Sequence, residues 1–279
     1  MAEPIIHLRA QSAYSLLEGA IKLPRLVELA HGNDMPALGL ADRNGMFGAL
    51  EFSEKAAAVG IQPIIGMLSG FRCEQREHAE RYQRQKFDHG RTGSPASIVL
   101  LASNQKGYRN LMALSSRAFL EKDDADQPHI TEAMLEHHAD GLICMTGGVE
   151  GPVAEALLHG NTRQADWHLD VLHALFGDRL YVEIQRHGMQ SEQQIEPAMI
   201  EMADRRGIPI VATNSVLFAE PDDFTAHDAM ICIAQGRAVA DSDRPKLTPE
   251  FHFRAQAAMR ETFSDLPDAL SATIEIAQR

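Results

Sequence analysis

Short apolar runs alternate with amphipathic stretches along most of the chain. After a first run from Ile5, the strand-like runs are Pro36–Ala41, Pro63–Phe71, Ser97–Ala102, Gly141–Thr146, Leu180–Gln185 and Ile208–Thr213. The segments between them repeat apolar residues at helical spacing. Such alternation predicts parallel strands joined by right-handed crossovers. Because seven units fit into about 220 residues, we expect a closed or nearly closed α/β barrel rather than an open sheet.

Polar side chains follow most of these runs. The first one, IIHLRAQSAYSLLEGA, changes from apolar to polar within a few residues. In a barrel of this kind the carboxyl ends of the strands meet on one face, where chemistry is usually placed. The residues expected on that face are Arg9, Gln11, Asp42, Arg43, Leu68, Gly147, Gly148, Gln185, His187, Asn214 and Ser215. Metal-assisted phosphoester hydrolysis would need several histidines and carboxylates there, and this set has few.

Length and composition favour one large domain in a reducing compartment. With 279 residues and 44% hydrophobic content, the chain can bury one sizeable core. We expect a single domain over 1–279, with the barrel at about 4–219 and a helical segment at about 220–279. Its three cysteines form no CxxC pair, and no apolar run approaches the roughly 20 residues of a membrane span. A cytoplasmic location without a membrane partner is therefore expected.

The charge balance argues against a primary DNA-binding surface. Lys and Arg total 26 against 39 Asp and Glu, a formal net charge of −13. Affinity for a phosphate backbone comes largely from Lys and Arg. Basic residues cluster only in the stretch from about 72 to 95, where acidic residues are interleaved. We expect this stretch to be a solvated, mobile loop.

Several long motifs together resemble one family. They are HLRAQSAYSLLEGA, GLADRNGMFGALEF, GIQPIIGMLSGF, YRNLMALSSRAFLE, GLICMTGG, YVEIQRHG, IPIVATNSVLF and AHDAMICI. In the same order and over essentially the whole chain, they are similar to the N-terminal polymerase and histidinol phosphatase (PHP) domain of bacterial replicative DNA polymerase III alpha subunits. The resemblance implies a distorted, TIM-barrel-like barrel of seven βα units. It also implies that active members hold a metal cluster through His, Asp, Glu and Cys residues at the strand ends.

Most of the metal-ligand positions implied by the resemblance carry other residues here. The positions are Arg9 and Gln11 for an HxH pair, Asp42 and Arg43 for an Asp-His pair, Leu68 for a glutamate, Ser97 for a histidine, Gly148 for a Cys or His, and Ser215 and Leu217 for an Asp-x-His pair. Of these positions, only Asp42 still carries a residue that can ligate a metal. Arg and Leu cannot ligate a metal, and Gln and Ser are weak neutral donors. We therefore expect salt bridges in place of the cluster, with Arg9 or Arg43 pairing with Asp42 or Glu18, and neither metal nor nuclease activity in this segment.

Two single features keep alternatives open. His187 could be a surviving ligand, although a lone histidine is more often simply hydrogen-bonded. The TGGVEG turn could hold an anion on free backbone N–H groups, but it lacks the phosphate-loop lysine, so a plain tight turn is favoured.

The resemblance implies three functions to compare. The first is a metal-free structural and interaction module that supports the polymerase palm and thumb and docks the proofreading exonuclease (epsilon) subunit. The second is an active metal-dependent phosphoesterase or 3′-5′ exonuclease, with a single metal held by Asp42, Glu18, Glu183 and His187. The third is a free-standing histidinol phosphatase-like enzyme, which the polymerase-type motifs disfavour. In the first case the parent protein is a DNA-directed DNA polymerase, a nucleotidyltransferase, whose Mg²⁺ site and main DNA contacts lie in domains beyond this chain.

Overall fold

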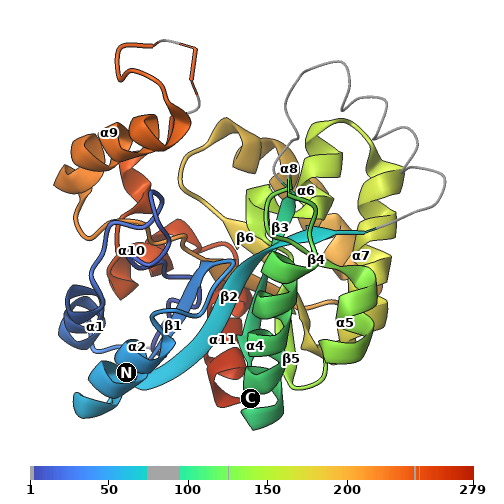
Figure 1. The fold of residues 1–279 in the computed structure, drawn as a ribbon, viewed down its shortest axis with the longest axis horizontal. Coiled ribbons are helices and arrows are strands. Elements are labelled where there is room, and N and C mark those ends of the chain that lie inside the picture. Colours follow the sequence, from blue (N-terminus) through green and yellow to red (C-terminus); the bar gives the residue numbers. More distant parts are fainter. Residues whose placement is uncertain (1–2, 74–94, 125, 242, 245) are drawn as a thin grey trace.

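The computed structural model describes residues 3–73, 95–124, 126–241, 243–244 and 246–279 (Figure 1). The strands are β1 (Ala37–Arg43), β2 (Gln62–Arg72), β3 (Ala96–Ala102), β4 (Ile130–Thr131), β5 (Leu142–Met145), β6 (Leu180–Gln185) and β7 (Ile210–Thr213). The helices are α1 (Leu23–Gly32), α2 (Ala49–Ala58), α4 (Gln105–Leu120), α5 (Glu132–His138), α6 (Pro152–Leu158), α7 (Thr162–Phe176), α8 (Gln190–Arg206), α9 (Phe224–Gln235), α10 (Gln256–Thr262) and α11 (Pro267–Gln278). Most of the loop expected at about 72–95 lies outside the described residues.

The strands form one curled sheet in the order β1-β2-β3-β5-β6-β7, with β4 paired to the end of β2. This confirms the expected barrel-like α/β fold. The expectation of uniformly parallel strands is wrong, because β3 runs antiparallel to both β2 and β5. The apolar pattern of a strand specifies burial and not direction. As a result, Ser97 near the start of β3 lies at the same edge as the ends of its neighbours.

The N-terminal segment joins the two edges of the curled sheet at their carboxyl ends. Ala10 bridges Leu40 of β1 on one side and Val216, just after β7, on the other. Ala41 N–H donates to the Ala10 carbonyl at 2.8 Å, and Gln11 N–H donates to the Val216 carbonyl at 3.0 Å. Residues 7–12 thus take the place of a short parallel strand and fix the direction in which the following polar residues leave the barrel.

Side chains of the sheet alternate between two apolar cores. Val99 and Leu101 of β3 point into the barrel interior, whereas Ile98 and Leu100 pack against the outer helices. Both faces are buried, as expected for a sheet surrounded by helices. Helix α11 contributes Ile276 to the interior core, so the C-terminal helices and the strands share one packed body. None of the helices within the described ranges is both long and apolar enough to cross a membrane.

Local signals explain where several helices begin and end. Asn104 caps α4, its side-chain oxygen accepting from the N–H groups of Lys106 and Gly107 at 3.0 Å. Proline occupies the first turn of α1, α6 and α11, where a missing N–H costs nothing. Gly207 ends α8 in the left-handed region at φ 62°. These boundaries leave the strand ends free to build the site.

Candidate functional site

Arg9 lies at the centre of a polar network on the carboxyl face of the sheet. Its side chain is only 1% exposed. Nη1 donates to the Gly147 carbonyl at 3.0 Å and to Glu183 of β6 at 3.3 Å, and Nη2 donates to Glu150. A buried guanidinium is tolerable only with such charge-compensating acceptors. Arg9 therefore ties the N-terminal segment to β6 and to the turn after β5.

Arg43, the last residue of β1, makes the second centre of the network. Its Nε donates to Glu18, Nη1 to Ser97 Oγ at 3.1 Å, and Nη2 to Glu150 Oε1 at 3.0 Å. The predicted pairing of an arginine with Glu18 is thus present. Glu150 accepts from both arginines, one on each carboxylate oxygen. It is the bridging group of the network.

The charges of the network shift the pKa values of its members. Burial alone would lower the pKa of Arg43, but Glu150 and Glu18 outweigh it and raise the pKa above its usual value. The side chain of Glu150 is 44% exposed, and its partial burial alone would raise its pKa. The positive charges of Arg43 and Arg9 outweigh burial, so the pKa of Glu150 lies below its usual value. Both groups are therefore ionised at neutral pH.

Asp42 is held by serines instead of the expected arginines. Its Oδ1 accepts from Ser12 N–H at 2.7 Å and Ser15 Oγ at 2.7 Å, and its Oδ2 accepts from Ser12 Oγ at 2.8 Å. Consecutive residues of a strand point to opposite sides, so Asp42 and Arg43 meet different neighbours. Burial raises the pKa of Asp42, although the hydrogen bonds from Ser15 and Ser12 partly oppose this.

Neutral amide and hydroxyl groups fill the space between β6 and β7. Gln185 Nε2 donates to Ser215 Oγ at 3.0 Å and also lies 3.3 Å from Glu183 Oε1 and Thr213 Oγ1. Its Oε1 occupies the room beside Gly148, because a Cβ at Gly148 would lie 2.4 Å from it. The side chain of Gln185 thus fills the space that a side chain at position 148 would occupy.

His187 has both ring nitrogens engaged. Nδ1 lies 2.6 Å from Glu192 Oε1, and Nε2 accepts from Ser215 N–H at 3.1 Å, so Nδ1 is the donor. The ring stacks on Phe251 at 3.9 Å. Burial lowers the pKa of His187 despite the Glu192 carboxylate, which keeps the ring neutral. This arrangement matches the expected hydrogen-bonded histidine and leaves Nε2 no free lone pair for a metal.

The other predicted positions lie nearby with varied contacts. Leu68 is fully buried in the barrel interior, opposite Arg43 in the β1–β2 register. Gln11 is 3% exposed, and its Oε1 has no hydrogen-bond partner among the described residues. Leu217 is buried and donates its N–H to the Phe251 carbonyl at 2.9 Å. Neither leucine contributes a polar side chain to the site.

The donor set does not fit the metal cluster that the family resemblance implies. Throughout the described ranges, no three or more His, Cys, Asp or Glu side chains are grouped so that they could hold a metal ion. Arg9 and Arg43 already engage the carboxylates of Glu18, Glu150 and Glu183 at the strand ends, so a metal ion would have to compete with two guanidinium groups for these oxygens.

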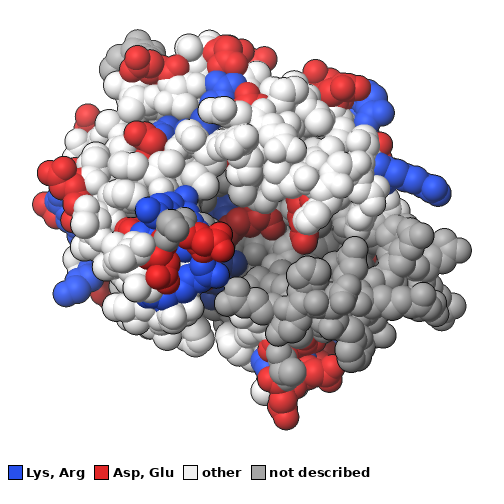
Figure 2. Space-filling view, turned by 90° about the horizontal axis from the view of Figure 1, so that it is seen from above, with Lys and Arg blue, Asp and Glu red and all other residues white. Residues whose placement is uncertain are grey.

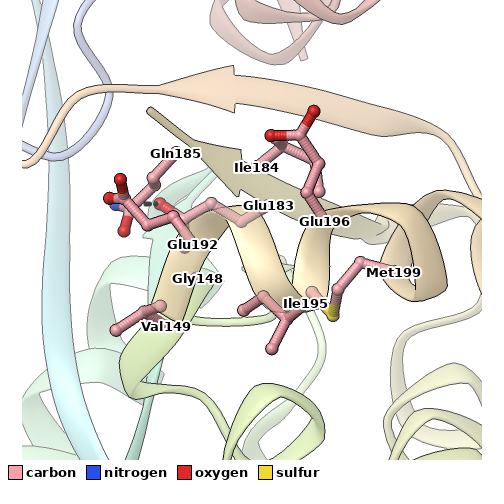
Figure 3. A pocket seen from close by; sticks show the side chains of 9 residues that line it. All are labelled: Gly148, Val149, Glu183, Ile184, Gln185, Glu192, Ile195, Glu196 and Met199. Atoms are coloured by element: carbon pink, nitrogen blue, oxygen red, sulfur yellow. Dashed lines mark hydrogen bonds between the residues drawn. The ribbon is translucent and has the colours of Figure 1, made fainter. Parts of the chain in front are cut away.

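Figure 2 shows a hollow in one face of the molecule, near which acidic and basic side chains lie next to one another. A pocket beside Glu183 of the network lies between the Gly148–Val149 turn and α8 (Figure 3). Glu183, Gln185 and Glu192 line one part of this pocket, and Ile195 and Met199 the other. Glu183 already has partners in Arg9 and Thr213 and Glu192 in His187, and Glu196, which also lines the pocket, is paired with Arg186.

Glu150 is a member of the site that sequence reasoning misses, because the TGGVEG motif predicts only a tight turn. The turn is indeed tight, a 3-10 turn over Gly148–Glu150 with Gly147 at φ 88°. The available signal was a single acidic residue within a glycine-rich turn directly after a predicted strand. Such a residue is carried to the same face as the strand ends and can meet any arginine there.

Comparisons with known proteins agree on one family. The model of the PHP domain matches residues 7–187. The DNA polymerase III subunit alpha of Caulobacter vibrioides is 42% identical over 274 residues, which are 98% of this chain and 23% of that protein. The corresponding Treponema pallidum subunit is 39% identical over 277 residues, again 98% and 23%. This chain thus spans about 23% of the length of these curated relatives.

Among solved structures, a putative metal-dependent phosphoesterase from Bifidobacterium adolescentis aligns with a TM-score of 0.43 at 13% identity, over 94% of this chain and 97% of that one. The matched range 7–187 includes Arg9, Arg43, Glu150 and Glu183. With a match over most of its length, the chain belongs to the PHP domain family.

Proposed function

We propose that this chain is the PHP domain of a bacterial DNA polymerase III alpha subunit and serves DNA replication as a metal-free structural and protein-interaction module. The relatives named DNA polymerase III subunit alpha, which match nearly the whole chain, support the first part. Under this proposal, nucleotidyl transfer with Mg²⁺ and most DNA contacts belong to other domains of a longer, cytoplasmic polypeptide.

The network of Arg9, Arg43 and Glu150 is the single observation that carries the metal-free assignment. In it, two guanidinium groups and a bridging carboxylate join the N-terminal segment, β1 and the turn after β5. A metal cluster would tie the same strand ends through shared ligands. The module would then support the palm and thumb and dock the proofreading exonuclease subunit, so that its contribution is positional rather than chemical.

Metal analysis of the purified 279-residue chain tests this function. The chain is incubated with Zn²⁺ and Mn²⁺, desalted, and measured by elemental analysis. We expect less than about a tenth of an equivalent of either metal, since guanidinium groups do not ligate. Hydrolysis of bis(p-nitrophenyl) phosphate with added Mn²⁺ should not exceed the rate of the protein-free control.

A stoichiometric metal that disappears in Asp42→Ala would overturn the metal-free assignment. Circular dichroism of that variant must first show that it is folded. Metal-stimulated hydrolysis lost in the same variant would establish the phosphoesterase or 3′-5′ exonuclease alternative.

A further inference from the structure

Two polar atoms of the N-terminal segment are buried without a hydrogen-bond partner among the described residues. They are Arg9 Nε, which can only donate, and Gln11 Oε1, which can only accept. Both side chains are closed to solvent, since Arg9 is 1% and Gln11 3% exposed. A buried polar atom without a partner costs free energy, and native proteins satisfy nearly all such atoms. The two atoms therefore indicate a bound polar group beside them.

Arg9 and Gln11 lie on the same side of the N-terminal segment. Between them, Ala10 bridges Val216: Val216 N–H donates to the Arg9 carbonyl at 3.3 Å, and Gln11 N–H donates to the Val216 carbonyl at 3.0 Å. Ala10 and Val216 both pack in the outer core together with residues of α1 and α2. Because the side chains of a strand alternate, Arg9 and Gln11 both point the other way, toward the polar network on the carboxyl face.

The spacing of the two side chains suits a single bridging molecule of the size of water. Residues two apart in a strand are separated by about 6–7 Å along the chain. One water that makes two hydrogen bonds joins atoms about 5 Å apart. Both side chains have several rotatable bonds, so Arg9 Nε and Gln11 Oε1 can approach to this distance.

Ser215 offers a third hydrogen bond at the same place. It precedes Val216 and is therefore next to Arg9 in the parallel register, with its side chain on the same side. Its Oγ accepts from Gln185 Nε2 at 3.0 Å, which leaves its own O–H to donate. A water here accepts from Arg9 and Ser215 and donates to Gln11. Three hydrogen bonds are typical of a buried water.

The chemistry of these three groups favours a neutral occupant. A carboxylate or sulfate ion would accept from Arg9 Nε but has no proton for Gln11 Oε1, and it would meet the nearby carboxylate of Glu183, which Arg9 already engages. A metal ion cannot accept a hydrogen bond from Arg9 Nε. Water both accepts and donates, and it carries no charge.

We propose that one buried water binds Arg9 Nε, Gln11 Oε1 and Ser215 Oγ and is part of the structure of this site. It joins the N-terminal segment to the segment after β7 through their side chains, in addition to the backbone hydrogen bonds between them. The inference rests on the metal-free assignment made above, because a metal ion bound to Gln11 Oε1 would displace the water.

Thermal unfolding of Gln11→Met in the 279-residue chain tests the proposal. Methionine has nearly the length and volume of glutamine, but its sulfur is only a weak acceptor. With the water present, the variant loses a hydrogen bond of the buried cluster, so the melting temperature should fall by at least about 2 °C.

The sign of this shift is decisive. If Gln11 Oε1 has no partner, replacing this buried acceptor by an apolar group leaves the melting temperature unchanged or raises it, and the proposal is overturned. Gln194→Met is the matched control, because Gln194 is exposed on α8; it should shift the melting temperature by less than about 1 °C.

A high-resolution crystal structure of the same chain, grown without added metal, identifies the occupant directly. We expect one water within about 2.7–3.2 Å of all three atoms. No density at this position, or a reversed Gln11 amide whose nitrogen donates to a protein acceptor, would overturn the water and leave the metal-free assignment intact.

Soaking these crystals in Zn²⁺ separates the inference from the function on which it rests. A water that stays in place supports both. An anomalous peak about 2.0–2.2 Å from Gln11 Oε1 would show a zinc ion instead and would overturn the water and the metal-free assignment together.

Discussion

Arg43 Nη2 donates to Glu150 Oε1 at 3.0 Å, while the other oxygen of the same carboxylate accepts from the buried Arg9. One half-exposed glutamate thus neutralises charge on two arginines that come from different segments. This carboxylate adds an ionic link to the backbone bridge that already joins the N-terminal segment to β1.

Replacing Glu150 by glutamine should destabilise the domain. Glu150→Gln keeps the size of the side chain but removes the charge shared by Arg9 and Arg43, and we expect a loss of roughly 1–3 kcal/mol in the free energy of unfolding. Urea denaturation measures it. Glu28→Gln, which breaks an exposed i,i+3 pair with Arg25, should cost less than about 0.5 kcal/mol. Equal effects of the two substitutions would argue against a special role for Glu150.

Removing the Ser12 hydroxyl should destabilise the domain in a pH-dependent way. Ser12→Ala deprives the buried Asp42 carboxylate of one hydrogen bond, at a cost of roughly 1–3 kcal/mol near neutral pH. Burial already raises the pKa of Asp42, so its charged form is disfavoured. The loss of stability caused by Ser12→Ala therefore appears as pH rises through the pKa of Asp42 in the folded state, where the carboxylate becomes charged. The difference between Ser12→Ala and wild type should therefore shrink in acid. Denaturation curves at several pH values would contradict this if the difference stayed constant.

His7 should make stability fall as pH falls from about 7 to 4. Its Nε2 lies 2.8 Å from the Arg254 carbonyl, and burial lowers its pKa to about 4. The unfolded state takes up a proton near pH 6.5, but the folded state does not until about pH 4, so acid favours unfolding by at most about 3 kcal/mol from this residue. His7→Gln should flatten the pH dependence of the unfolding free energy, whereas a substitution at the exposed His31 should leave it unchanged.

Gly148 and Gln185 should be coupled. Gly148→Ala introduces a Cβ 2.4 Å from Gln185 Oε1 at a φ of 55°, so we expect destabilisation both from the clash and from backbone strain of about 1 kcal/mol. In a Gln185→Ala background only the strain should remain. A double-mutant cycle by thermal unfolding measures the coupling, and additive effects would show that Gln185 does not fill this space.

The sequence predicted β1, β2, β3, β5, β6 and β7, because each combines an apolar run with flanking turn residues. It missed the two-residue strand β4, and the run from Ile5 leads only to isolated bridges. It could not predict the direction of β3, since Ser97–Ala102 reads the same in a parallel and an antiparallel pair. At the site, the Glu18–Arg43 pair was one of the salt bridges expected once the family resemblance had placed Arg43 at a metal-ligand position. The partners of Asp42 did not, because Ser12 and Ser15 carry no charge signal and their approach depends on the turn. Glu150 was missed because a glycine-rich turn gives no periodicity that places its side chain.

The position of residues 7–12 between β1 and the segment after β7 has a consequence for folding. Val216, which borders these residues on the far side, is made more than two hundred residues after them. Contacts of such long sequence separation form slowly, because loop-closure entropy is lost before they are gained. Before β6 is made, Arg9 lacks Glu183, one of its two carboxylate partners, and the sheet has an open edge. Chains interrupted before β6 are accordingly the species from which aggregation is expected to start.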